Sequence, residues 1–280
     1  MKAASFLAPQ RTWRWKALRY SVQHGARDGI EGWRVSGEGE TDAERLWELL
    51  GRLFKTHPWH GVPAGEEAPR VVTVYVEIVP SDAVKYEVDK VTGHLKVDRP
   101  QKFSNVCPSL YGFVPRTFSG EQVAELARRR TGRAALAGDG DPIDVCVLSE
   151  RSFSHGDFLL RAQPIGGLRV IDGDQADDKI VAVLEGDLTF GKIEDLGELP
   201  RPVVERLEHY FLTYKLAIDA GSLASGTSAA PIAARQTEVE IAGVFGRDEA
   251  REVIERGLAD YRERFPDLKE QILATLRGTV

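Results

Sequence analysis

The sequence contains few cysteines, no long hydrophobic run and no excess of positive charge. Cys107 and Cys146 are the only cysteines among 280 residues. Because two thiols are too few for a disulfide framework, we expect a reducing, cytoplasmic environment. No apolar stretch approaches the roughly 18–20 residues of a membrane-spanning helix, so we expect no membrane insertion. The formal net charge of −6 argues against nucleic acid as the main partner.

Acidic residues are absent from the first 27 positions, which carry six basic residues. All five tryptophans lie within the first 59 residues, so composition changes sharply after this region. We interpret residues 1–65 as an N-terminal extension with short strands near 11–22 and 31–36 and a helix at about 42–55. Packing on the domain that follows is the favoured role, because large aromatic side chains rarely stay exposed; a subunit contact or a site for another protein are the alternatives.

Residues 66–280 are predicted to form one domain rich in β-structure. Runs of β-branched and aromatic residues, separated at short intervals by Gly, Asp and Pro, favour a barrel or sandwich over β-α-β units. The predicted strands are Val71–Val79, Lys85–Asp89, Leu95–Val97, Val145–Leu148, Phe158–Pro164, Arg169–Ile171 and Ile180–Leu184. Helices are predicted at about 120–130, 200–217 and 247–277, the last broken near Pro266.

Three carboxylates fall within six residues at Asp139, Asp141 and Asp144, on a Gly/Pro turn that leads into an apolar strand. Crowded carboxylates repel one another, and hard oxygen ligands at this density indicate a divalent cation such as Mg²⁺. The alternative is a solvated acidic turn, since Asp, Gly and Pro are all common in turns. A second acidic cluster, 172–178, is followed by Lys179, which could bind an anion that the metals also contact.

Basic and phenolic candidates are scattered along the rest of the chain. Taken singly, each is an ordinary surface or edge residue, and spacing alone does not bring them together. They are Lys85, Arg99, Tyr111, Tyr214 and Lys215.

Taken together and in this order, these candidate residues make the sequence resemble the family I soluble inorganic pyrophosphatases. The family signature, Asp-x-Asp-Pro-x-Asp followed by an aliphatic residue, is matched fully at 139–145. Other family landmarks follow the family order over about residues 70–260. They are Glu77 in Tyr-Val-Glu-Ile, Lys85-Tyr86-Glu87, Asp98-Arg99, Tyr111-Gly112, Pro164–Leu168, Asp172 with Asp177 and Lys179, and Tyr214-Lys215.

The resemblance implies a mostly β fold with flanking helices (α+β), built on an OB-like five-stranded barrel. It implies hydrolysis of inorganic diphosphate to two phosphates with Mg²⁺, for which Mn²⁺ or another divalent ion could substitute, in a homo-oligomer. The implied metal ligands are Asp139, Asp144, Asp172, Asp177, Glu77 and Glu87. The implied phosphate ligands are Lys85, Arg99, Lys179, Tyr214 and Lys215. Asp141 would act as general base, with Tyr111 near Asp141 or its water.

Two features depart from the family pattern. Cys107 stands where many bacterial members have a tyrosine, and the segment 116–138 is longer than in compact bacterial members. Three rival functions are a catalytically silent module on the same barrel, a structural calcium loop, and hydrolysis of nucleoside diphosphate derivatives. The calcium loop lacks a terminal bidentate glutamate, and Arg256 interrupts the Nudix-like stretch 251–257.

Overall fold

The computed structural model describes residues 55–102, 104–215 and 239–265, which all fall within a compact unit that begins at Gly51. The extension's predicted strands and its helix, apart from Lys55, lie outside these residues. The described elements are β1 (Val72–Ile78), β2 (Val84–Val88), β3 (Leu95–Pro100), β4 (Leu110–Phe113), α2 (Glu121–Thr131), β5 (Ala137–Gly138), β6 (Asp144–Leu148), β7 (Phe158–Asp172), β8 (Gln175–Ala176), β9 (Lys179–Leu184), the 3-10 helix η1 (Leu196–Glu198), α3 (Arg201–Thr213), β10 (Val239–Gly246) and α5 (Arg247–Arg264).

Five strands pair in a ring. The order β1-β4-β6-β9-β7 is continuous, and β7 pairs again with β1, so the pairing returns to its first strand. This ring is the predicted OB-like five-stranded barrel. Short strands β8 and β5 extend one edge, β10 pairs with β7, and β2 with β3 forms a separate hairpin. All of the contacts in the ring are antiparallel except β6–β9, which is parallel.

Alternation of side chains along the strands divides the interior into two apolar clusters. In β6, Val145 and Val147 join one cluster, whereas Cys146 and Leu148 join the other. Successive side chains of a strand point to opposite faces, and here the side chains on both faces are buried. The first cluster packs against α2 and α5, and the second against α3. Both cysteines are buried and free, as small apolar side chains.

The strand β7 differs from the sequence-based prediction. Two strands were expected, Phe158–Pro164 and Arg169–Ile171, but the chain continues as one strand of 15 residues. The register against β9 shifts between Pro164 and Gly166, so the proline and glycines form a bulge and not an end. Strands β4 and β10 were not predicted: β4 has only four residues, and both contain an internal glycine, which weakens the strand pattern.

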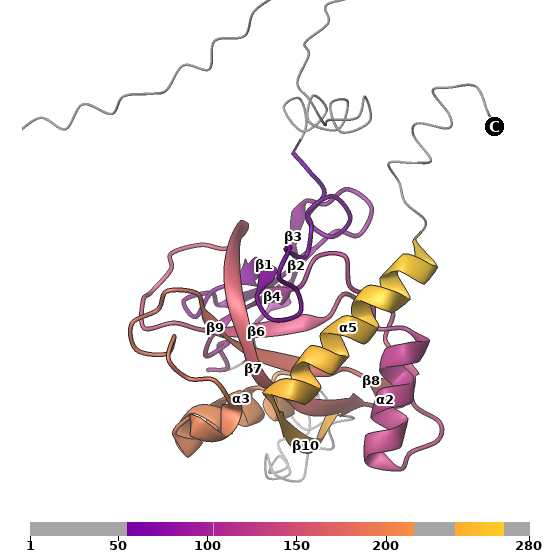
Figure 1. Ribbon diagram of the computed structural model, residues 1–280. Helices are drawn as coiled ribbons and strands as arrows, with labels where there is room; N and C mark the ends of the chain where they lie inside the picture. Colours follow the sequence, from indigo (N-terminus) through magenta and orange to yellow (C-terminus); the bar gives the residue numbers. More distant parts are fainter. Residues whose placement is uncertain (1–54, 103, 216–238, 266–280) are drawn as a thin grey trace, which may run out of the picture. The chain divides into compact units, whose positions relative to one another are not determined.

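The predicted helices are confirmed within the described residues, and the part of the last one beyond residue 265 lies outside them. Helix α3 ends at Thr213, short of residue 217. Helix α5 ends at Arg264, two residues before Pro266, in keeping with the bias against helix just ahead of proline. Figure 1 shows α5 running beside α2, and the two helices are in contact. Among the described residues, no helix is long and apolar enough to cross a membrane.

Candidate active site

The acidic turn lies beside the second acidic segment because of two parallel strand pairs, β5–β8 and β6–β9. Gly138 of β5 pairs with Ala176 of β8, so the residues that follow them, Asp139 and Asp177, emerge side by side. On the other side of β7, Asp144 at the start of β6 pairs with Lys179 at the start of β9. The topology therefore joins residues far apart in the sequence at one end of the sheet.

Lys179 connects the carboxylates of the two segments. Its side chain is only 2% exposed, and its Nζ donates hydrogen bonds to Asp144 and Asp177. Burial by itself lowers the pKa of this amine, but the two carboxylates more than offset it and hold the pKa well above its ordinary value. Lys179 is therefore a buried, charged bridge within the acidic cluster.

Tyr111 reaches the same cluster from β4. Its hydroxyl donates a 2.6 Å hydrogen bond to Asp144, whereas the resemblance placed it near Asp141 or its water. Neighbouring strands β4 and β6 place Tyr111 opposite Cys146, one pleat from Asp144, which explains the choice of partner. Burial and the charge of Asp144 raise the pKa of the phenol well above its usual range, so Tyr111 stays a donor.

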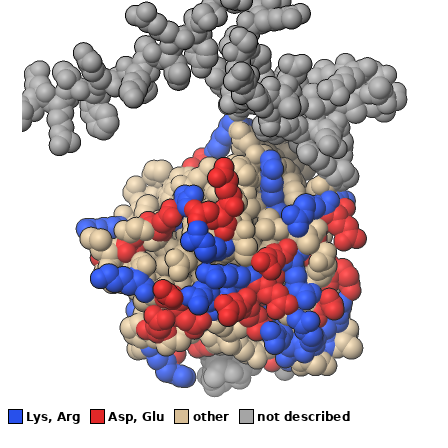
Figure 2. All heavy atoms as spheres, viewed as in Figure 1, with Lys and Arg blue, Asp and Glu red and all other residues tan. Residues whose placement is uncertain are grey.

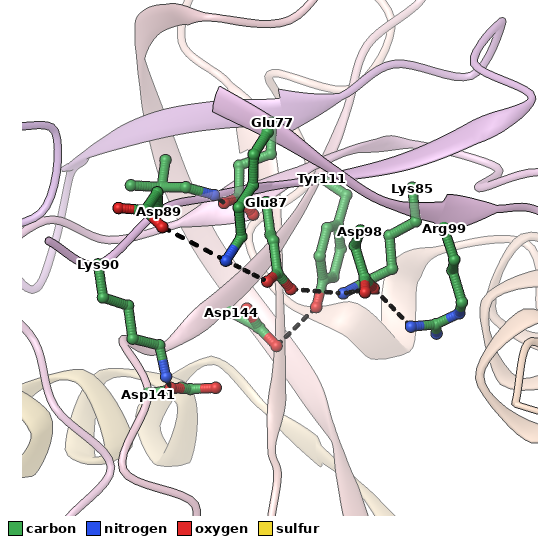
Figure 3. A network of polar contacts seen from close by, with 12 residues as sticks. Glu77, Lys85, Glu87, Asp89, Lys90, Asp98, Arg99, Tyr111, Asp141 and Asp144 are labelled. Carbon is green, nitrogen blue, oxygen red and sulfur yellow. Dashed lines mark hydrogen bonds and ion pairs between the residues drawn. The ribbon is translucent and has the colours of Figure 1, made fainter. Parts of the chain in front are cut away.

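The β2–β3 hairpin carries a row of alternating charges above the acidic turn (Figure 3). Lys85 lies 3.0 Å from Asp98 and 3.4 Å from Glu87, and Asp98 also pairs with Arg99. Just past the end of β2, Lys90 extends to the carboxylate of Asp141. Lys90 thus links the hairpin to the acidic turn, whereas Lys85 and Arg99 pair with carboxylates of the hairpin itself.

Glu77 fixes the hairpin to the barrel. Its carboxylate accepts a 2.6 Å hydrogen bond from the backbone N–H of Val88, which joins β1 to β2. Burial, followed by the charges of Asp144 and Glu87, raises the pKa of Glu77 to about 8 despite the hydrogen bond. Glu77 therefore holds its proton at neutral pH when no other cation is near.

The end of α3 supplies the remaining phosphate-ligand candidates. Tyr214 is the C-cap residue of the helix and is buried, and Lys215 pairs with Asp172 at the end of β7. The guanidinium carbon of Arg99 lies 5.7 Å from the centroid of the Tyr214 ring, within the range of a cation–π contact. The helix and the hairpin thus meet over the edge of the barrel.

A cavity of about 100 Å³ lies between the hairpin and the barrel. Both signs of charge line it: Lys85 and Lys90 on the hairpin, and Asp141 and Asp144 on the barrel. The full lining is Trp59, Glu77, Lys85, Glu87, Val88, Lys90, Tyr111, Phe113, Asp141, Pro142 and Asp144. Asp139, Asp172 and Asp177 do not line it, and Asp177 is joined to the lining residue Asp144 through Lys179.

The carboxylates at this edge are short of positive charge. Burial and the neighbouring Asp177 raise the pKa of Asp139 to about 8, and burial likewise raises the pKa of Asp177 although Lys179 opposes it. In the described part of the chain, no three such ligands are arranged around a single point. A hard-oxygen donor set with unmet negative charge fits a divalent cation, provided that the carboxylates close around it.

Three residues at the site were not assigned from the sequence. Lys90 contacts Asp141, Asp98 holds both Lys85 and Arg99, and Trp59 lines the cavity although the prediction placed it in the extension. Asp98 could have been found as the acidic partner in Asp-Arg. Lys90 and Trp59 carry no local signal, because only the folded hairpin brings them to the cavity.

Comparison with known proteins identifies a family for this fold. The model of the inorganic pyrophosphatase family matches residues 74–262. The inorganic pyrophosphatase of Chlamydia trachomatis is 46% identical over 213 residues, which are 76% of this chain and 97% of that protein. The soluble inorganic pyrophosphatase of Zea mays is 39% identical over 181 residues, covering 62% of this chain and 76% of that protein.

Solved structures resemble the fold at lower sequence identity. The crystal structure of inorganic pyrophosphatase from Thermus thermophilus has a TM-score of 0.57 and 28% identity, over 74% of this chain and 99% of that one. The structure of an inorganic pyrophosphatase from Coxiella burnetii has a TM-score of 0.54 and 26% identity, over 71% of this chain and 99% of that one.

Proposed function

The chain belongs to the inorganic pyrophosphatase family, and on that premise we propose how its side chains divide the work of hydrolysing inorganic diphosphate. The reaction converts diphosphate to two phosphates and uses a divalent metal ion. The observation that carries the proposal is the joining of Asp144, Asp177 and Lys179 at the starts of two parallel strands. Both a cation site and an anion site can form there.

Mg²⁺ is the proposed metal, with Mn²⁺ as a possible substitute, because all of the candidate ligands are hard carboxylate oxygens. When bound, it supplies positive charge at the phosphates and makes a coordinated water more acidic. The residues that would hold the metal ions are Asp139, Asp144, Asp172 and Asp177, with Glu77 and Glu87 contributing partly through water. Their raised pKa values, where present, fall as a cation approaches.

Asp141 is proposed to orient the attacking water and accept its proton. Its side chain is 44% exposed, against 21% for Asp144, so water can reach it. Tyr111 keeps Asp144 oriented through its hydrogen bond. With Asp141 as the proton acceptor beside the oriented ligand Asp144, the attacking water is positioned by the protein and not by the solvent.

Five side chains are proposed to bind the phosphate oxygens. Arg99 can offer two parallel donors to one phosphate, whereas the lysines act as point charges. Lys85 and Lys215 are now paired with Asp98 and Asp172 and would exchange these partners for substrate. Tyr214 would donate from its hydroxyl, and Lys179 from within the carboxylate cluster.

The decisive experiment measures phosphate release from diphosphate by the purified full-length protein with Mg²⁺. Asp141→Asn keeps the shape of the side chain but cannot accept the proton, so we expect a loss of at least 10²-fold in kcat. Asp174→Asn is the control, because Asp174 is exposed in the turn beside Asp172. Wild-type turnover by the Asp141 variant would refute the general-base role, and no release by the wild type would favour a silent module.

A homo-oligomer in the cytoplasm, without nucleic-acid partners, completes the proposal. Exposed apolar side chains on strands, including Leu159 and Val244, offer candidate subunit contacts. Basic side chains are interspersed with acidic ones over the face in Figure 2, which supports the absence of a nucleic-acid surface there. Light scattering coupled to gel filtration tests the oligomer.

A further inference from the structure

The segment that carries α2 leaves the barrel and returns to it at one point, directly beside the acidic turn. A Cβ atom at Gly138, where the segment returns, would lie 2.1 Å from the carbonyl oxygen of Ser119, where it departs. Only glycine permits this approach. The long segment is therefore connected to the site at both of its ends.

Ser119 holds the acidic turn through its backbone. Its N–H donates to the carbonyl of Asp141 at 2.8 Å, and its own carbonyl accepts from the N–H of Gly140 at 3.1 Å. Its hydroxyl donates to the carbonyl of Ala176 at 3.3 Å and accepts from the N–H of Asp139 at 3.4 Å. One buried serine thus contacts the backbone at or next to Asp139, Asp141 and Asp177.

The next residue, Gly120, is held by a carboxylate from α5. Helix α2 has no capping side chain of its own. Asp260 accepts hydrogen bonds from three backbone N–H groups at its start, at 3.0 Å from Gly120, 3.0 Å from Gln122 and 3.1 Å from Val123. Its side chain lies in the interface between the two helices and is 4% exposed as a residue. An anion there satisfies unpaired donors and complements the helix dipole.

We propose that Asp260 is a positioning residue for metal binding, acting through Gly120 and Ser119 on the acidic turn. Asp260 itself touches none of the candidate ligands. Fixing the peptide between residues 119 and 120 fixes the four Ser119 contacts, and with them the separation of Asp139 from Asp177. The inference rests on the proposed metal-binding role of Asp139. It also assigns a task to the segment 116–138.

The test compares two carboxylates that cap helices in the same protein. Asp195 accepts from the N–H groups of Gly197 at 3.0 Å and Arg247 at 2.9 Å, and belongs to no part of the site. Asp260→Ala and Asp195→Ala are made in the full-length chain, together with Asp260→Asn as a milder variant. Mg²⁺ affinity is measured by calorimetric titration without substrate, and Tm is measured without metal.

Both alanine variants should lower the metal-free Tm, since each removes a cap. Only Asp260→Ala should weaken Mg²⁺ binding, by about tenfold or more, the range found when groups that orient metal ligands are removed. Asp260→Asn retains an acceptor and should give a smaller loss in the same direction, which keeps the test readable if the alanine variant does not fold. Wild-type Mg²⁺ affinity in Asp260→Ala, or an equal loss in Asp195→Ala, would overturn the inference.

A second experiment tests whether Asp260 acts through Ser119. Ser119→Ala removes the hydroxyl contacts, and its effect on Mg²⁺ affinity should be less than additive with that of Asp260→Ala, because both variants loosen the same turn. Simple additivity would contradict the route. Asp139→Asn is the reference: if it weakens Mg²⁺ binding and Asp260→Ala does not, only the positioning role fails. If neither variant does, the metal-ligand role of Asp139 fails as well.

Discussion

The backbones of Asp144 and Lys179 pair across two parallel strands, and the amine of this lysine donates to the carboxylate of its own register partner. A second donor bond reaches Asp177, two residues earlier in the chain. Opposite charges are thus held at one edge by the sheet itself and do not depend on loop conformation. Changes to this group of residues should affect stability and metal binding together.

Lys179→Met is expected to destabilise the metal-free protein strongly. The substitution leaves two carboxylates without their buried counter-charge, and breaking a buried pair typically costs about 3–5 kcal/mol. Saturating Mg²⁺ should recover part of the loss, since it binds only the folded state. Denaturant titration with and without Mg²⁺ measures both effects. Lys96→Met is the control, because Lys96 makes only half-exposed pairs with Glu87 and Asp89.

Stability of the metal-free protein should fall as pH rises from about 6.5 to 8. The pKa values of Asp139 and Glu77 are raised to about 8, so the folded state retains protons that the unfolded chain has already lost. His60 acts in the opposite sense at lower pH, because burial lowers its pKa to about 4 and the unfolded state then binds the extra proton. Above about pH 6.5 that contribution is constant.

Denaturant midpoints at several pH values in the presence of a chelator check this slope. Asp139→Asn should flatten it, and Mg²⁺ should flatten it in the wild type by replacing the proton. A metal-free midpoint that rises between pH 6.5 and 8 would contradict the raised pKa values.

Tyr111→Phe should separate catalysis from folding. The variant loses one hydrogen bond to Asp144, worth about 1 kcal/mol in stability. Asp144 is a proposed metal ligand, and its loss of orientation should slow the reaction more than it destabilises the fold. We therefore expect kcat to fall by about tenfold. Tyr210→Phe is the matched control, because its hydroxyl bonds to Gln101 outside the cavity. Equal kcat losses in both variants would argue against a specific role for Tyr111.

Lys90→Met tests the cation that the sequence did not reveal. Its pair with Asp141 is more than half exposed on the lysine side, so stability should change by less than about 1 kcal/mol. Removal of a positive charge from the cavity should raise the KM for diphosphate, and the difference from wild type should shrink as salt concentration rises. A salt-independent KM effect would indicate a contact of another kind.

Features whose signal lies in neighbouring residues could be predicted from the sequence. The acidic turn carries its signature within seven residues, and strands such as β6 have clear β-branched composition. Gly167 was placed in a gap between two predicted strands, because the reason for a glycine there is distant: a Cβ atom would lie 2.4 Å from the ring of Phe245. The cap by Asp260 likewise joins residues 140 positions apart. Neither relationship leaves a pattern in its own neighbourhood.

The parallel pairing of β6 with β9 also has a consequence for how activity arises during folding. A parallel pair cannot close by a hairpin, and here the chain must first run through all of β7 and β8 before β9 reaches its partner. Contacts of such long sequence separation are slow to form. Diphosphate hydrolysis should therefore appear late in refolding, after most secondary structure, and its recovery would report when the barrel closes.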